Sequence, residues 1–290
     1  MEIVHTVEWM KQIAREARAT GRIIGLVPTM GALHEGHFSL IRAAQEQCSP
    51  VVVSIFVNPT QFGPQEDFEK YPQRTEEDHA ALDSLDVDYL FAPDAAGMYP
   101  SGFRSSVNVD GLGDRLEGRS RPGHFRGVAT VVMKLLQIVQ PDFAYFGRKD
   151  AQQVVVIQAM ARDLNLDSWV VVRPIVREPD GLAVSSRNVY LDRHQRQTAT
   201  ALHRALAAAG EAIARGERDA ARITRVAREV LQREPLLAVD YVEIVDADTL
   251  EPVITLRGTC LILLAALAGT TRLIDNALIT AAGGKFQVAI

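Results

Sequence analysis

The chain reads GRIIGLVPTMGALHEGH from Gly21 to His37, and this stretch decides the fold. The apolar residues between Arg22 and Val27 predict a strand that ends at Pro28, and a helix is expected from about His37 to Gln47. Backbone N–H groups at a helix start that follows a glycine-containing turn form an anion site. The stretch therefore predicts a strand, a turn and a helix that together can bind a phosphate.

The residues that follow repeat this alternation of strand and helix. The continuous apolar run from Val51 to Val57 predicts a strand buried on both faces of a parallel sheet. Further strands are expected at 87–91, 143–146 and 169–175, and further helices behind Thr6 as N-cap and at 75–84, 127–139 and 150–164. This order predicts an α/β fold with a Rossmann-like, doubly wound parallel sheet, in which ligands lie at the carboxyl ends of the strands. The long region 93–123, rich in Gly, Pro and Ser, predicts a functional loop or irregular structure.

The pattern changes near residue 175. Ala-rich helices are expected at about 193–215 and 219–233, and strands at 239–245, 261–267 and 271–278, the last two joined by a hairpin-like turn. We therefore expect two domains, a Rossmann-like domain over 1–175 that binds ligands and a smaller α+β domain over 176–290 that closes over the site.

Composition excludes several classes of protein. The 290 residues are 47% hydrophobic and 23% charged, which is a globular balance rather than that of a disordered or fibrous chain. The net charge of −5, without a block of like charge, argues against nucleic acid as the main partner. Two cysteines, Cys48 and Cys260, form neither a disulfide framework nor a metal motif. No signal peptide and no membrane span are evident, so a cytoplasmic location is expected.

Two histidines in the deciding stretch are the first candidates for chemistry. His34 and His37 lie three residues apart where phosphates would bind, and both imidazoles can donate to developing negative charge. A purely structural role as polar groups at the helix start is the alternative. A zinc site fits poorly, because the spacing is not H-E-x-x-H and no third ligand is evident.

Polar residues also follow two other predicted strands. Asn58 and Gln61 come after the buried strand, where neutral amides suit a hydroxylated acid, although Asn58-Pro59 can also be a simple turn. Lys149 offers a charge to a phosphate and Asp150 can accept from ribose hydroxyls, whereas a surface lysine beside a helix-capping aspartate is the alternative.

The segment 28–37 resembles the HIGH-type motif of the nucleotidylyltransferase superfamily, in the version found in the pantothenate synthetase (pantoate–β-alanine ligase) family. Four later segments resemble the same family in the same order: Phe56–Gly63, Arg121–Val128, Phe146–Gln153 and Asp180–Asn188. The resemblance covers most of the chain and is densest from 22 to 191.

The resemblance implies a role for each matching residue. His37, His34 and Lys149 would be catalytic, and Gln61, Gln153 and Asn58 would bind pantoate, with Gln61 also near β-alanine. The residues implied to bind ATP are Met30, Gly31, Ala32, Leu33, His34, Glu35, Gly36, His37, Gly147, Arg148, Lys149, Asp150, Val176, Val184, Ser185, Ser186 and Arg187. The metal ligands are not implied.

The implied activity is the ATP-dependent condensation of (R)-pantoate with β-alanine to pantothenate, through a pantoyl adenylate and with release of pyrophosphate and AMP. ATP and Mg²⁺, a homodimer and no nucleic acid or membrane partner are expected with it. Another adenylate-forming nucleotidylyltransferase is the enzymatic alternative, and an inactive nucleotide-binding protein is the alternative of a different class. Pantoate-dependent pyrophosphate release would separate all three.

The chain departs from the family pattern in places. Arg74 is displaced by one position in Tyr71–Thr75, and Arg148 stands where glutamate is common. Glu77 and Asp78 could lie beside magnesium, but an exposed helix face explains them as well. Arg121 and His124 could help to close the pocket.

Overall fold

Residues 1–64 and 66–290 are described by a computed structural model, in which the chain folds as two units. The first comprises Met1–Gly147 and Val156–Arg173, and the second Arg148–Val155 and Pro174–Ile290. The chain thus passes to the second unit after Arg173, and the short segment Arg148–Val155 also groups with that unit. The functional roles expected for the two domains stay predictions.

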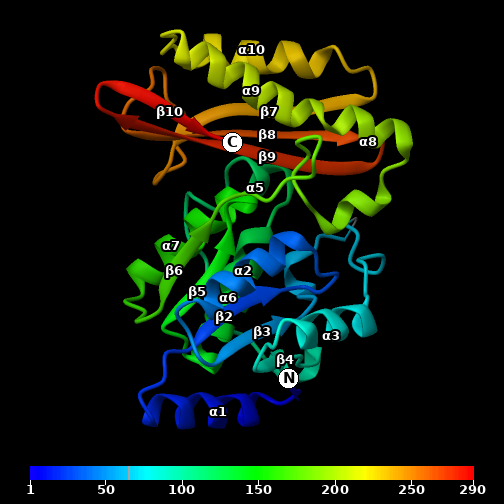
Figure 1. The fold of residues 1–290 in the computed structure, drawn as a ribbon, viewed down its shortest axis with the longest axis vertical. Helices are drawn as coiled ribbons and strands as arrows, with labels where there is room; N and C mark the ends of the chain where they lie inside the picture. The colour runs from blue at the N-terminus through cyan, green and yellow to red at the C-terminus, as the bar shows by residue number, and fades with distance from the viewer. Residues whose placement is uncertain (65) are drawn as a thin grey trace. The chain divides into compact units, whose positions relative to one another are not determined.

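The first unit is built on a parallel sheet of six strands, ordered β1-β4-β3-β2-β5-β6 (Figure 1). Its strands are β1 (Glu2–Val4), β2 (Gly25–Thr29), β3 (Val51–Ile55), β4 (Tyr89–Phe91), β5 (Phe143–Gly147) and β6 (Trp169–Arg173). From β2 the chain builds outward through β3 to β4, and then returns to the other side of β2 as β5. The strand order therefore reverses between β2 and β5, which is where doubly wound sheets bind ligands.

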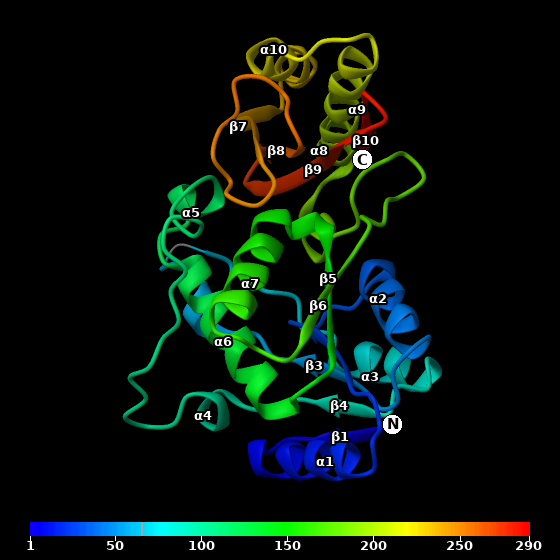
Figure 2. The ribbon, with the colours of Figure 1, turned by 90° about the vertical axis from the view of Figure 1, so that its left-hand side faces the viewer.

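Helices cover both faces of this sheet, as a doubly wound fold requires. They are α1 (Val7–Ala19), α2 (Glu35–Gln45), α3 (Thr75–Ser84), α6 (His124–Val139) and α7 (Ala151–Asp163), of which α7 begins in the segment of the second unit. Figure 2 shows α2 and α3 on one side of the sheet and α6 on the other. Leu40 and Ile41 of α2 and Leu82 of α3 pack with Val51 and Val53 of β3 in a common core. Burial of these residues confirms the α/β prediction.

Most predicted elements of this unit are present, with shifted ends. Thr6 caps α1 as expected, because its Oγ1 accepts from the N–H of Trp9 at 3.3 Å. The helix expected from His37 begins at Glu35, since the extended residue His34 is the N-cap. Region 93–123 is largely irregular, with two short helices, α4 (Ala95–Met98) and α5 (Glu117–Ser120). The three-residue edge strand β1 was not predicted.

The second unit is an antiparallel sheet of four strands, ordered β10-β9-β8-β7, packed with helices. Its elements are η2 (Arg148–Asp150), η3 (Ser186–Tyr190), α8 (Arg193–Ala199), α9 (Ala201–Ala214), α10 (Ala220–Gln232), β7 (Leu237–Asp246), β8 (Thr259–Ala268), β9 (Thr271–Ala282) and β10 (Lys285–Ala289). Gly269, with φ of +61°, makes the expected hairpin turn between β8 and β9.

Two expectations for this unit were wrong. The helix expected over 193–215 is two helices that meet at Thr200, and a fourth strand, β10, follows the turn at Gly283 and Gly284. Its five residues are too few to give a clear strand signal. In the described part of the chain, no helix is long and apolar enough to cross a bilayer.

Candidate functional site

The turn after β2 is held to the neighbouring strand by a threonine. Thr29, only 8% exposed, donates from Oγ1 to the carbonyl oxygen of Ser54 on β3 at 2.8 Å. The same Oγ1 accepts from the N–H of Gly31 at 3.2 Å. Gly31 and Ala32 then take the left-handed conformation, with φ of +81° and +49°, so the backbone turns sharply. A side chain at Gly31 would meet Asp78 Oδ2 at 3.0 Å, which explains the glycine.

A buried carboxylate completes this turn. Asp78 of α3 is 4% exposed, and its Oδ2 and Oδ1 accept from the N–H groups of Ala32 and Leu33 at 2.8 and 2.7 Å. The exposed-face interpretation is therefore wrong for Asp78. It holds for Glu77, which is exposed and pairs with Arg74 at 3.3 Å, so the displaced arginine lies at the surface.

The two histidines of the motif lie together at the start of α2. The rings of His34 and His37 stack with their centroids 4.0 Å apart. The carbonyl oxygen of His34 accepts from the N–H groups of His37 and Phe38, at 2.8 and 3.0 Å. A Cβ at Gly36 would come within 2.9 Å of the His34 ring, so this glycine leaves room for the stack. Two half-buried imidazoles thus lie at the N-terminus of a helix, where anions bind.

The amide of Asn58, which follows β3, is fully used by the protein itself. Asn58 is 1% exposed, and its Nδ2 donates to Gln61 Oε1 at 3.0 Å and to the carbonyl oxygen of Gly127 at 3.2 Å. Its Oδ1 accepts from Thr60 Oγ1 at 2.9 Å and from the Tyr99 hydroxyl at 2.8 Å. Asn58 is therefore placed to fix the short helix η1 (Pro59–Gln61) rather than to lie open to a ligand.

Gln61 joins η1 to the motif after β2. Its Nε2 donates to the sulfur of Met30 at 3.1 Å, while its Oε1 accepts from Asn58. Gly127 on α6 permits this position, because a Cβ there would lie 2.3 Å from the Thr60 carbonyl oxygen and 2.7 Å from Gln61 Cα. The residue expected to bind pantoate thus contacts a residue expected to bind ATP.

A chain of partly and fully buried side chains, Glu66, Arg121 and His124, holds the backbone of Gln61. Arg121 makes a two-pronged ion pair with Glu66, with Nε 2.9 Å from Oε1, and donates from Nη1 to His124 Nε2 at 3.1 Å. Because a guanidinium can only donate, Nε2 of His124 must accept, and its Nδ1–H donates to the Gln61 carbonyl oxygen at 2.8 Å. His124 is therefore neutral. Burial, reinforced by the charge of Arg121, lowers the pKa of His124 to about 4.

Glu66 is the anionic end of this series of hydrogen-bonded side chains. Burial alone would raise the pKa of the Glu66 carboxyl, but the hydrogen bonds and the charge of Arg121 outweigh burial and lower it. The carboxylate thus stays ionised and holds Arg121 in place. Arg121 and His124, expected to help close the pocket, are found supporting the Gln61 turn.

Apart from Gly147, which ends β5 in the first unit, the remaining predicted residues belong to the second unit. Lys149 and Asp150 lie in η2, with Lys149 Nζ 3.6 Å from Asp150 Oδ1, and Gln153 follows on α7. The carbonyl oxygen of Val176 accepts from the N–H of Val184 at 3.0 Å, and this bond closes the loop between the two residues. It leads to Ser185, which caps η3 by accepting from the N–H of Arg187 at 3.3 Å. Gln61 and Gln153, both expected to bind pantoate, therefore come from different units.

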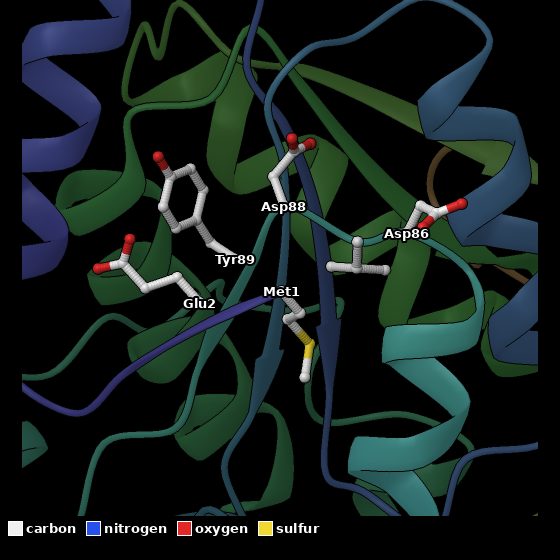
Figure 3. Close-up of a pocket in the computed structure, with 6 residues that line it drawn as sticks. Met1, Glu2, Asp86, Asp88 and Tyr89 are labelled. Atoms are coloured by element: carbon white, nitrogen blue, oxygen red, sulfur yellow. The ribbon is translucent and has the colours of Figure 1, made fainter.

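A pocket at the opposite end of the first sheet is a poor candidate. It has a volume of 310 Å³ and is lined by Met1, Glu2, Asp86, Val87, Asp88 and Tyr89 (Figure 3). These residues precede or start β1 and β4, so the pocket lies at the amino ends of the strands. Asp88 accepts from the N–H of Val51 at 2.8 Å and Glu2 from the Trp9 indole at 2.8 Å. Acidic side chains with structural bonds do not suit an anionic ligand.

Sequence reasoning missed the supporting residues of the site. An exposed helix face also explained Asp78, the sequence gave no special role to Gly127, and Glu66 was not among the candidate residues. Asp78 is the third of three consecutive acidic residues in the first turn of α3, and the sequence gives no sign of which of them is buried. Only the fold brings α3 and α6 against the turns they support.

The neutral His124 should make stability depend on pH. The unfolded chain takes up a proton at this imidazole near pH 6.5, whereas the folded chain does so only near 4. The unfolded state therefore binds more protons between these values, and the free energy of unfolding should fall as the pH decreases through this window. Between about pH 7 and pH 5 the contribution of His124 is about 2 kcal/mol.

Urea unfolding at these two pH values measures the effect. The His124→Gln variant should lose about 2 kcal/mol less than the wild type on going to the lower pH. The exposed His194 provides the control, since His194→Gln should lose as much as the wild type. Equal losses in wild type and His124→Gln would show that His124 is not held neutral.

Comparison with known proteins identifies the family. The family model described as pantoate-beta-alanine ligase matches residues 2–278. A pantothenate synthetase of Heliobacterium modesticaldum is 56% identical over 276 residues, which cover 95% of this chain and 98% of the relative. That of Pelotomaculum thermopropionicum is 52% identical over 279 residues, with 96% and 99% covered.

Solved structures agree with the sequence relatives. A pantothenate synthetase of Thermus thermophilus superposes with a TM-score of 0.91 at 45% identity, covering 95% of this chain and 98% of that one. A pantoate-beta-alanine ligase of Francisella tularensis, complexed with beta-gamma ATP and beta-alanine, has a TM-score of 0.77 at 36% identity, covering 95% and 97%. From the family model, the relatives and the shared fold, this chain belongs to the pantoate–β-alanine ligase family.

Proposed function

We propose that this chain condenses (R)-pantoate with β-alanine at the expense of ATP. A pantoate carboxylate oxygen attacks the α-phosphorus of ATP, the bond to the β-phosphate oxygen breaks, and pyrophosphate leaves. The β-alanine amine then attacks the acyl carbon of pantoyl adenylate, AMP leaves, and the amine loses a proton to give the amide. No bond to the protein forms in either step.

The observation that carries this proposal is the contact between Gln61 and Met30. An amide suited to the oxygens of a hydroxylated acid touches the turn suited to phosphates, so the two reactants of the first step would meet there. In our proposal Gln61 and Gln153 bind pantoate, Gln61 also lies near β-alanine, and Asn58 positions Gln61. The ligands named for the Francisella tularensis relative are of the same two kinds, a nucleotide and the amine.

The ATP-binding residues supply positive charge and N–H donors. His34 and His37 at the start of α2, together with Lys149, would stabilise the charge that builds on the α-phosphate and on departing pyrophosphate. The segments 30–37, 147–150, Val176 and 184–187 would hold the nucleotide. Loops that exclude water protect the adenylate from hydrolysis.

Magnesium is proposed to arrive on the phosphates of ATP. Among the described residues, no group of three or more His, Cys, Asp or Glu side chains could hold a metal ion. Mg²⁺ typically keeps water ligands and takes the rest from substrate phosphates and one or two carboxylates, which fits this chain. When bound, the ion neutralises phosphate charge.

We further propose that the protein is a cytoplasmic homodimer without nucleic-acid or membrane partners. β6 is an edge strand that carries the exposed Trp169, and an open strand edge can pair with a second chain, which supports self-association. The net charge of −5 supports the absence of a nucleic-acid partner.

Pyrophosphate release tests the order of events. With ATP and (R)-pantoate but no β-alanine, the protein should release about one pyrophosphate per site, because the adenylate is held rather than turned over. His37→Ala and Lys149→Ala should each lower the rate by roughly 10²–10³, the scale of losing one preorganised donor, with little change in Tm.

His194→Ala and Lys11→Ala remove exposed residues of the same types and should keep the wild-type rate. Release that strictly requires β-alanine would contradict the two-step proposal. Release with other acids as fast as with pantoate would instead favour a different adenylate-forming enzyme.

Gly127→Ala should disturb the pantoate site from α6. The added Cβ cannot fit 2.3 Å from the Thr60 carbonyl oxygen, so η1 and Gln61 must move. We expect a loss of about 1–3 kcal/mol in the free energy of unfolding and a rise of about tenfold or more in the KM for pantoate. The KM for ATP should rise less.

Gly210 is the matched control, since it also lies within a helix, α9. A Cβ there would make ordinary contact with Val288 at 3.6 Å, so Gly210→Ala should be neutral or stabilise by about 0.5–1 kcal/mol. If Gly127→Ala kept both KM values, the close approach of α6 would not position Gln61.

A further inference from the structure

Two buried polar residues stand side by side on the apolar strand β9. Asp275 and Asn276 are 2% and 1% exposed, and on β8 they pair with Leu264 and Leu263. Burying a charge and an amide in such a sheet costs free energy, which hydrogen bonds to neighbouring groups offset. Their bonding partners therefore indicate what the two residues are for.

Asn276 holds the backbone of η2. Its Nδ2 donates to the carbonyl oxygens of Arg148 and Lys149, at 2.8 and 3.0 Å. These two bonds use both N–H groups of the amide and fix two consecutive peptide units. The side chain of Arg148 adds a further bond, from Nη2 to the Ala289 carbonyl oxygen on β10 at 3.0 Å. The turn from which Lys149 projects is thereby tied to the C-terminal sheet.

Asp275 holds the loop that leads to Ser185. Its two oxygens accept from Nη1 and Nη2 of Arg177 at 2.8 and 2.9 Å, with the carboxylate side chain only 1% exposed. Arg177 Nη1 also donates to the Gly181 carbonyl oxygen at 3.0 Å. A β-bridge between Arg177 and Ala183 closes the same loop. This pair therefore fixes the base of the loop before η3.

The two anchors are themselves joined. Asp275 Oδ1 also accepts from the backbone N–H of Asn276 at 2.8 Å. A side chain at Gly181, where φ is +92°, would lie 2.2 Å from the ring of His203 on α9, so the loop also packs closely against that helix. Both segments are thus held by adjacent residues of one strand.

We infer that Asp275 and Asn276 are positioning residues for ATP, which hold the Lys149 turn and the Ser185–Arg187 segment at a fixed separation within the second unit. The inference rests on the proposed roles of those two segments in nucleotide binding. Neither residue touches the nucleotide. Each acts by removing freedom from a donor-bearing segment before ATP binds, and such preorganisation determines how well charges are stabilised.

Steady-state kinetics with each substrate varied in turn test the inference. Asn276→Ala removes both N–H donors and leaves the carbonyl oxygens of Arg148 and Lys149 without them. We expect the KM for ATP to rise about tenfold, while the KM for pantoate stays within about twofold. Hydrogen exchange of the amides in 148–152 should quicken in the same variant, and exchange in 30–37 should not.

Ile279→Val is the matched control on β9. It removes one methylene from a residue that is 0% exposed, and it should lower Tm without changing either KM. Should Asn276→Ala not fold, Arg177→Lys keeps the charge but loses the two-pronged contact with Asp275, and it must raise the KM for ATP in the same way. An unchanged KM in that variant would overturn the inference.

Lys149→Ala, measured in parallel, separates the inference from the proposed function. Suppose that Lys149→Ala lowers the rate, but Asn276→Ala has the same KM for ATP as the control Ile279→Val. The positioning role is then wrong and the proposed function stands. If Lys149→Ala keeps wild-type kinetics, the assignment of Lys149 is wrong and the positioning role falls with it. A selective rise in the KM for ATP in Asn276→Ala, with Lys149→Ala also impaired, supports both.

Discussion

The carboxylate of Asp78 bonded to two consecutive backbone N–H groups is the constraint on which the first half of the site depends. Ala32 and Leu33 donate to it at 2.8 and 2.7 Å, directly after the left-handed residue Gly31. Without a buried acceptor, two N–H groups in this sharp turn would lose their bonds to water and gain none in return. The carboxylate thus sets where the chain leaves β2 and where α2 and its two histidines begin.

The same principle, a buried polar group that fixes the backbone of a segment with a proposed binding role, recurs through the molecule. Asn58 and His124 hold the two ends of the Gln61 turn, and Asp275 and Asn276 hold two segments in the second unit. Each costs free energy to bury, and the hydrogen bonds to the segment that it holds offset part of that cost. Buried polar groups thus fix the position of segments for which we propose roles in substrate binding.

The sequence was sufficient to predict the fold class and to locate the motif segments. It did not predict the residues that hold those segments in place. Periodicity located the buried strand at Val51 and the helix over 75–84, because burial on a sheet imposes a pattern on neighbouring residues. The sequence near Asp78 does not predict its bond to the N–H of Ala32, 46 residues away. The sequence near Gly127 does not predict how closely the backbone of Thr60 approaches it. Short elements such as β1 and β10 were missed because their few residues carry too little pattern.

The most direct test of whether the turn after β2 depends on the Asp78 carboxylate is to measure the turnover of Asp78→Asn. An asparagine keeps the shape but has one acceptor oxygen, so its NH₂ group would face the N–H of Ala32 or Leu33. With an unsatisfied buried donor costing about 1–3 kcal/mol, kcat/KM for ATP should fall about tenfold to a hundredfold. Glu77→Gln, on the exposed neighbour, should leave it unchanged. A wild-type kcat/KM in folded Asp78→Asn would contradict the role of this carboxylate.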